Sequence, residues 1–163
     1  MKTKTEIDKR VQELFMQEYM CAQIISIITQ EISGLDSDDV TKAMTVFSGG
    51  VGRDGTACGA LSASLAMLGL AMGCGRQGES DPRITKYAKK IYDHFAEVNG
   101  FAHCKDIVGV NWWDSSSAIK FYGNIEKINE CKQRIVNQIA YMADILDEVK
   151  KLKCQQFPLL KSK

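Results

Sequence analysis

The most restrictive feature of the sequence is a segment, residues 58–72, that carries no charge and consists almost entirely of Ala, Leu, Met, Ser and Gly. A helix that is apolar on every side is packed by other elements on several sides. The segment is too short and too rich in small residues to span a bilayer. It therefore predicts a central helix over residues 57–73, packed inside an all-α bundle.

Apolar residues recur at helical spacing elsewhere, and no run alternates with the period of two that strands show. Thr3 or Thr5 can cap a first helix that continues through residues 11–32 and stops at Gly34. Further helices are expected over residues 36–47, 82–100 and 125–152. We therefore predict a single-domain bundle of about five helices, with a helical domain over residues 1–153 and a flexible C-terminal tail over residues 154–163.

Charge and composition exclude several classes of function. The chain has 21 basic and 20 acidic residues, and its net charge of +1 lacks the basic excess of a protein that binds nucleic acid or anionic lipid. The first residues contain no apolar stretch of the signal-peptide type, which predicts a cytoplasmic protein without membrane insertion. Six cysteines in a reducing compartment point to metal-binding, catalytic or buried thiols rather than to a disulfide framework.

Cys58 is the cysteine most favourably placed for chemistry. It opens the central helix directly after a glycine-rich loop, residues 48–55, so the helix dipole and free amides are expected to lower the pKa of its thiol. Backbone amides that turn inward can also bind anions. This reasoning assigns cofactor binding to the backbone at Gly50, Gly52, Gly55 and Gly59.

Other motifs give weaker signals. Residues 50–55 match GxGxxG, but they follow a predicted helix rather than the strand that a dinucleotide-binding unit requires. The chain contains no CxxC and no HExxH. Of the two histidines, His103 precedes Cys104 and is a candidate ligand or neighbour of a ligand, while His94 is expected at the surface. Trp112 and Trp113 are interpreted as a hydrophobic plug or a contact surface.

Four cysteines in their sequence contexts resemble a known family. The segments are Tyr19-Met-Cys-Ala-Gln23, Gly49-Gly-Val-Gly-Arg-Asp-Gly-Thr-Ala-Cys-Gly-Ala60, Cys104-Lys-Asp-Ile-Val-Gly109 and Cys131. Together they resemble the C-GCAxxG-C-C redox proteins over roughly residues 11–148. One departure is that Cys-Gly-Ala-x-x-Gly is here completed by Ala63, which places a methyl group at a close helix contact.

The resemblance implies an all-helical redox-active domain, related to a domain of split-Soret cytochromes c that is associated with an iron–sulfur centre. Carried over position by position, the family cysteines are Cys21, Cys58, Cys104 and Cys131. Cys74 and Cys154 fall outside the pattern. Cys74 lies about 24 Å from Cys58 along a straight helix, at ~1.5 Å per residue, and is therefore interpreted as structural or exposed.

The leading hypothesis is a cytoplasmic redox protein that binds an iron–sulfur cluster through these four cysteines, for electron transfer or redox sensing. The alternatives are a metal-free thiol–disulfide protein that uses Cys58 with a resolving cysteine, a non-enzymatic helical scaffold, and a zinc site on the same thiolates. We expect a redox partner protein that the sequence does not identify, and a homodimer is compatible with it. No acid–base constellation indicates an enzymatic reaction.

Overall fold

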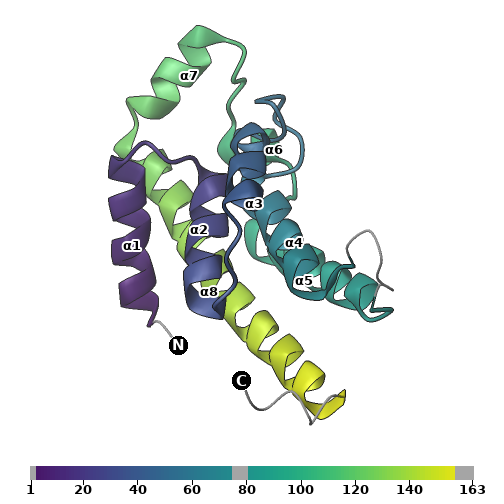
Figure 1. Cartoon of the computed structure of the whole chain (residues 1–163). Helices are drawn as coiled ribbons and strands as arrows, with labels where there is room; N and C mark the ends of the chain where they lie inside the picture. The colour runs from purple at the N-terminus through teal and green to yellow at the C-terminus, as the bar shows by residue number, and fades with distance from the viewer. Residues whose placement is uncertain (1–2, 75–80, 157–163) are drawn as a thin grey trace.

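The computed structural model describes residues 3–74 and 81–156, with side chains up to residue 152, and these residues form an all-α bundle (Figure 1). No strand occurs in these two ranges, and one isolated bridge joins Ala57 to His103. The helices are α1 (Lys4–Met16), α2 (Cys21–Ser33), α3 (Asp38–Ala43), a 3-10 turn η1 (Met44–Phe47), α4 (Gly59–Met72), α5 (Ile84–Asn99), α6 (Cys104–Val108), α7 (Ser115–Tyr122) and α8 (Ile125–Gln156). The predicted all-α class is confirmed.

Helix α4 forms the centre of the bundle, as its uncharged sequence predicts. It packs against α2, α5 and α8, which surround it on several sides. Ala63 and Met67 of α4 are completely buried, as are Ile25 and Ile28 of α2. Ala63 thus occupies the core without difficulty, because the surrounding side chains accommodate its methyl group. This packing fixes where α4 begins, and therefore where Cys58 lies.

The continuous first helix expected over residues 11–32 is wrong. The chain forms two helices, α1 and α2, separated by a turn at residues 17–20. Glu18 adopts a left-handed conformation with φ of 64°, and the Tyr19 amide donates to the Leu14 carbonyl at 3.1 Å. This is the hydrogen bond that closes a helix with a left-handed C-terminal residue, usually glycine. Without a glycine at position 18, the sequence gave no signal for the break, which makes Cys21 the first residue of α2.

Three smaller differences separate the fold from the sequence-based expectation. Helix α5 begins at Ile84 rather than at Pro82, after Asp81 Oδ1 accepts a hydrogen bond from the Arg83 amide. Helix α7 was not predicted. The backbone of residues 154–156 continues α8, and the rest of the predicted tail, residues 157–163, lies outside the described residues.

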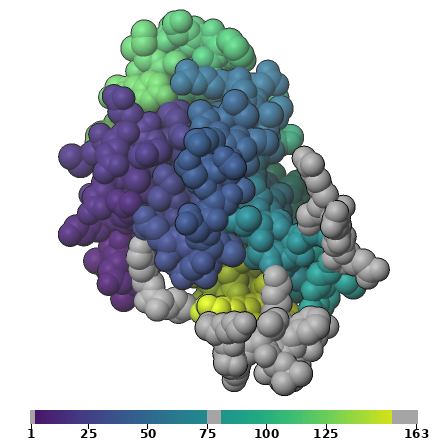
Figure 2. Space-filling view, viewed as in Figure 1, coloured from purple at the N-terminus to yellow at the C-terminus, as the bar shows by residue number. Residues whose placement is uncertain are grey.

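Helix α7 covers one end of the bundle. In Figure 1 it stands above the end of α1 and the beginnings of α2 and α8, and Figure 2 shows the same green segment over α1 and the glycine-rich loop. The described helices include none with the length and apolarity to cross a membrane. The covered end is where the predicted cysteines lie.

A buried polar contact joins α4 to α8. Gln138 Nε2 donates to Ser64 Oγ at 3.0 Å, and both residues are buried. Gln138→Ala is expected to lower the free energy of unfolding by about 1–3 kcal/mol, because a buried polar partner and its packing are lost. Chemical denaturation measures this, with Gln133→Ala on the exposed side of α8 as the control. Equal effects of the two substitutions would contradict the role of this contact.

Candidate functional site: a cavity lined by four cysteines

Three helices begin with a cysteine at the end of the bundle that α7 covers. Cys21 is the first residue of α2, Cys58 is the N-cap of α4 and Cys104 is the first residue of α6. Cys131 lies near the beginning of α8. The amino end of a helix carries partial positive charge, which favours thiolates. The sequence analysis predicted this placement for Cys58 only.

The same four cysteines, and neither Cys74 nor His103, line one cavity of about 460 Å³, called here the thiol cavity. Its other lining residues are mostly apolar or aromatic: Phe15, Met16, Glu18, Tyr19, Met20, Gly49, Arg53, Ala60, Ile107, Val108, Trp112, Phe121, Tyr122, Ile128, Lys132, Arg134 and Ile135. All four thiols are free. The fold therefore gathers the four predicted cysteines, which are spread over 111 positions of the chain, at one site.

The glycine-rich loop attaches α6 to the beginning of α4. The Cys58 amide donates to the Ala102 carbonyl, and the amides of Cys104 and Lys105 donate to the carbonyls of Thr56 and Gly55. These bonds, next to the bridge between Ala57 and His103, hold Cys104 beside Cys58.

The predicted cofactor-binding glycines shape this loop rather than supply most of the amides. Gly52 and Gly55 donate their amides to the carbonyls of Val46 and Gly49 inside the loop, so these two amides do not face the thiols, contrary to expectation. Gly50 has φ of 80°, and a Cβ there would lie 2.7 Å from the backbone of Gly55 and Thr56. The loop closes at Gly50 only because no side chain is present.

Gly59 allows α2 to approach α4 closely. A Cβ at this position would lie 2.8 Å from Cys21 Sγ and 2.9 Å from the Phe47 carbonyl oxygen. Gly59 therefore contributes space for a thiol, not an amide to a cofactor.

Burial raises the pKa of the Cys21 thiol to about 11, and a charge on Cys58 would raise it further. The Ser48 hydroxyl and the Gly49 amide act in the opposite direction, since both face the sulfur and would stabilise a thiolate. Ser48 Oγ is buried and has no conventional hydrogen-bond partner among the described residues. It is thus a donor that only an ionised sulfur would satisfy.

Cys58 and Cys104 share a proton. Their sulfurs hydrogen-bond to each other, which raises the pKa of Cys58 well above its ordinary value and lowers that of Cys104. The helix amides of Ala60 and Leu61 lower the pKa of Cys58, as the sequence suggested, but Cys104 and burial outweigh them. The prediction of a low pKa at Cys58 is therefore wrong, and Cys104 is the thiol that ionises more readily.

Trp112 faces the same sulfur. Its indole Nε1 is buried without a conventional partner among the described residues, and its proximity to Cys104 contributes to the lowered pKa of that thiol. Of the two tryptophans, Trp112 is the plug that the sequence suggested, whereas Trp113 is 73% exposed.

Burial raises the pKa of Cys131 to about 12, and charges on Cys21 and Cys58 would raise it too. Arg134 opposes this shift through its charge and a hydrogen bond. Four thiols that disfavour each other's ionisation are thus surrounded by donors placed for thiolates. Sequence reasoning missed Ser48, Gly49 and Arg134, because only the fold brings them to the sulfurs.

The remaining candidates lie elsewhere. Cys74 is exposed at the far end of α4, as expected. His103 pairs its Nδ1 with Asp106 Oδ2 at 3.3 Å at the surface, and His94 stacks on Tyr141. The side chain of Cys154 lies outside the described residues.

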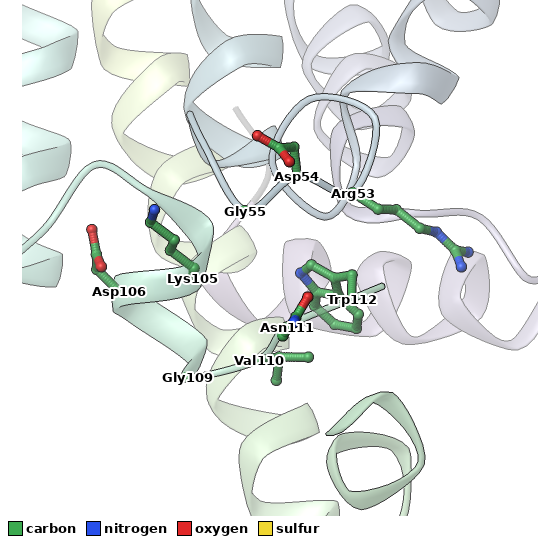
Figure 3. Close-up of a pocket in the computed structure, with 9 residues that line it drawn as sticks. All are labelled: Arg53, Asp54, Gly55, Lys105, Asp106, Gly109, Val110, Asn111 and Trp112. Carbon is green, nitrogen blue, oxygen red and sulfur yellow. The ribbon is translucent and has the colours of Figure 1, made fainter. Parts of the chain in front are cut away.

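A second, polar pocket adjoins the thiol cavity (Figure 3). It lies between the glycine-rich loop, α6 and residues 109–112. In Figure 3 the charged ends of Arg53, Lys105 and Asp106 point away from one another. Trp112 lines both spaces and forms the wall between them, so the indole separates the sulfurs from this open pocket.

The model of the family described as "Putative redox-active protein (C_GCAxxG_C_C)" matches residues 19–146, a range that contains all four cavity cysteines. The chain belongs to this family. No match is found among curated proteins or among solved structures.

The cysteine order of the family motif is complete in this redox-active family member, but the central motif is not. Aligned on Cys58, the fixed positions of GCAxxG are occupied by Ala57, Gly59 and Ser62. The departure assigned to Ala63 in the sequence analysis is therefore misplaced. The cysteines themselves, rather than the small residues around them, carry the match to the family.

The lowered pKa of Cys104 predicts the pH dependence of its alkylation in metal-free protein. Only the thiolate reacts, so the rate at Cys104 should rise with pH and level off below the ordinary thiol range of about pH 8.5. Trp112→Phe removes the N–H and should move this profile to higher pH. Mass spectrometry of iodoacetamide-treated Cys74→Ser protein measures it, and an unchanged profile in Trp112→Phe would contradict the indole's role.

Proposed function

We propose that the four cavity cysteines bind an iron–sulfur cluster, and that this cytoplasmic protein uses it for electron transfer or redox sensing. The supporting observation is the convergence of four free thiols from α2, α4, α6 and α8 on one largely apolar cavity. Thiolates are the ligands such clusters require, and their sequence spacing is free when the fold supplies the geometry.

The donors around the sulfurs fit this group. The hydroxyl of Ser48 and the indole of Trp112 are buried without conventional partners among the described side chains, and each faces a cysteine sulfur. Arg134 adds positive charge beside Cys131. A cluster with four thiolates is anionic, so these groups would stabilise it and tune its potential. When bound, the cluster would supply one-electron redox chemistry.

The spread of the sulfurs favours a cluster over a zinc ion. Among the described residues, no three His, Cys, Asp or Glu side chains gather closely enough to hold one metal ion. Zinc requires all its sulfurs at about 2.3 Å from a single atom. A cluster is wider, and its cysteines bind different iron atoms.

A second candidate function is thiol–disulfide exchange between Cys58 and Cys104, favoured by the hydrogen bond between their sulfurs. The Cys104 thiolate would attack a small-molecule disulfide and release one thiol. Cys58, deprotonated, would then attack the mixed disulfide and release the second thiol, so that the pair loses two electrons.

The absorption spectrum of protein purified without oxygen, together with zinc analysis, tests the choice. A broad brown absorption between 400 and 450 nm (roughly, as for clusters in general) that bleaches with dithionite supports the cluster. A colourless protein with one zinc per chain would contradict it in favour of zinc. A colourless, metal-free protein that forms a Cys58–Cys104 disulfide with oxidised glutathione would contradict it in favour of the dithiol.

A further inference from the structure

The thiol cavity has two facing walls besides its sulfurs. One is aromatic and comes from α7 and the preceding loop: the ring centroids of Trp112 and Phe121 are 5.1 Å apart, and those of Phe121 and Tyr122 are 5.5 Å apart. The other comes from the end of α1 and the turn after it, with Phe15, Met16 and Tyr19. Aromatic and methionine side chains provide flat, adaptable contact area for rings.

The aromatic wall is partly open to solvent. Tyr122 and Met16 line the cavity although they are 54% and 85% exposed. The volume of about 460 Å³ falls within the range typical of small-molecule sites. An open, apolar space of this size between two walls suits a flat molecule that enters from solvent.

Two cations mark one side of this space. Lys132 Nζ lies 5.3 Å from the centroid of the Phe15 ring, and Arg53 extends from the glycine-rich loop. Neither forms an ion pair in the described part of the chain, and one acidic residue, Glu18, lines the cavity with them. Unlike Arg134, neither is a main cause of any cysteine pKa shift. Their charge is therefore available to an occupant other than the sulfurs.

We propose that the thiol cavity is also a binding site for a small, flat aromatic compound with one anionic group, its ring between the α7 wall and the α1 wall and its anion facing Lys132 and Arg53. The aromatic walls select the ring, and the unpaired cations select the anion. This binding does not require a cluster, so it is independent of the proposed function.

The probe for the test is naphthalene-2-sulfonate, which is flat, anionic and unreactive towards thiols. Trp113→Phe leaves Trp112 as the single tryptophan, and its fluorescence reports occupancy of the cavity. We expect saturable quenching by the probe and none by cyclohexanesulfonate, which has the anion without the flat ring. Lys132→Gln and Tyr122→Ala, added to this background, should each weaken the affinity at least about fivefold.

The matched controls lie on α7 outside the cavity. Lys120→Gln and Ile119→Ala remove an exposed charge and a 70% exposed apolar side chain, and both should leave the affinity unchanged. Circular dichroism confirms that each variant is folded. Absence of saturable quenching, or equal losses in control and cavity variants, would overturn the proposal. Iron measured on the same samples reports separately on the cluster.

Discussion

Gly59→Val is expected to lower the free energy of unfolding by about 1–3 kcal/mol and to prevent metal binding. The Cβ alone would lie 2.8 Å from Cys21 Sγ and 2.9 Å from the carbonyl oxygen of Phe47, a backbone atom that moves only with η1. The family motif, aligned on Cys58, carries alanine here, so relatives accommodate one methyl group. The two further methyl groups of valine would displace Cys21 from the thiol cavity.

Gly69→Val is the matched control for Gly59→Val. Gly69 lies on the same helix, and a Cβ there meets nothing within 4 Å. Because valine has a slightly better helix propensity than glycine, this variant should be as stable as wild type or slightly more so. Denaturant unfolding and iron content measure both variants. If Gly59→Val unfolds and binds iron like Gly69→Val, the close approach of α2 to α4 has no role in the site.

Cys21→Ser and Cys131→Ser are each expected to lose most of the iron bound after anaerobic reconstitution, although these two cysteines lie 110 positions apart and are only half-buried. The reason is that both line the thiol cavity, and a serine hydroxyl is a poor substitute for a thiolate ligand. Iron per chain, determined after removal of unbound metal, measures the loss.

Cys74→Ser is the control for these ligand variants. Its thiol is exposed at the other end of α4 and should contribute nothing to the bound iron. Retention of full iron in both Cys21→Ser and Cys131→Ser, or a comparable loss in Cys74→Ser, would contradict the assigned ligand set.

The sequence predicted the central helix and the end of the bundle at which chemistry occurs, because both follow from local patterns. An uncharged segment of small residues has few alternatives to a buried helix, and Cys58 after a glycine-rich loop marks its beginning. The resemblance supplied the four cysteines, and the structure places them around one cavity.

The parts that could not be predicted depend on contacts between distant segments. The break before Cys21 relies on Glu18 in a left-handed conformation, which the sequence does not signal. The order of the thiol pKa values depends on the hydrogen bond between Cys58 and Cys104, residues 46 positions apart. Sequence reasoning treated Cys58 as an isolated thiol at a helix terminus, and for that reason assigned the lowered pKa to the wrong cysteine.

The most direct test of the central claim is iron and acid-labile sulfide per chain, measured on protein purified without oxygen for wild type and Cys58→Ser. The account predicts both elements in wild type, in similar amounts, and neither in the variant, since Cys58 lies at the beginning of α4 in contact with Cys104. Iron and sulfide that persist in Cys58→Ser, or a wild-type protein without either, would contradict it.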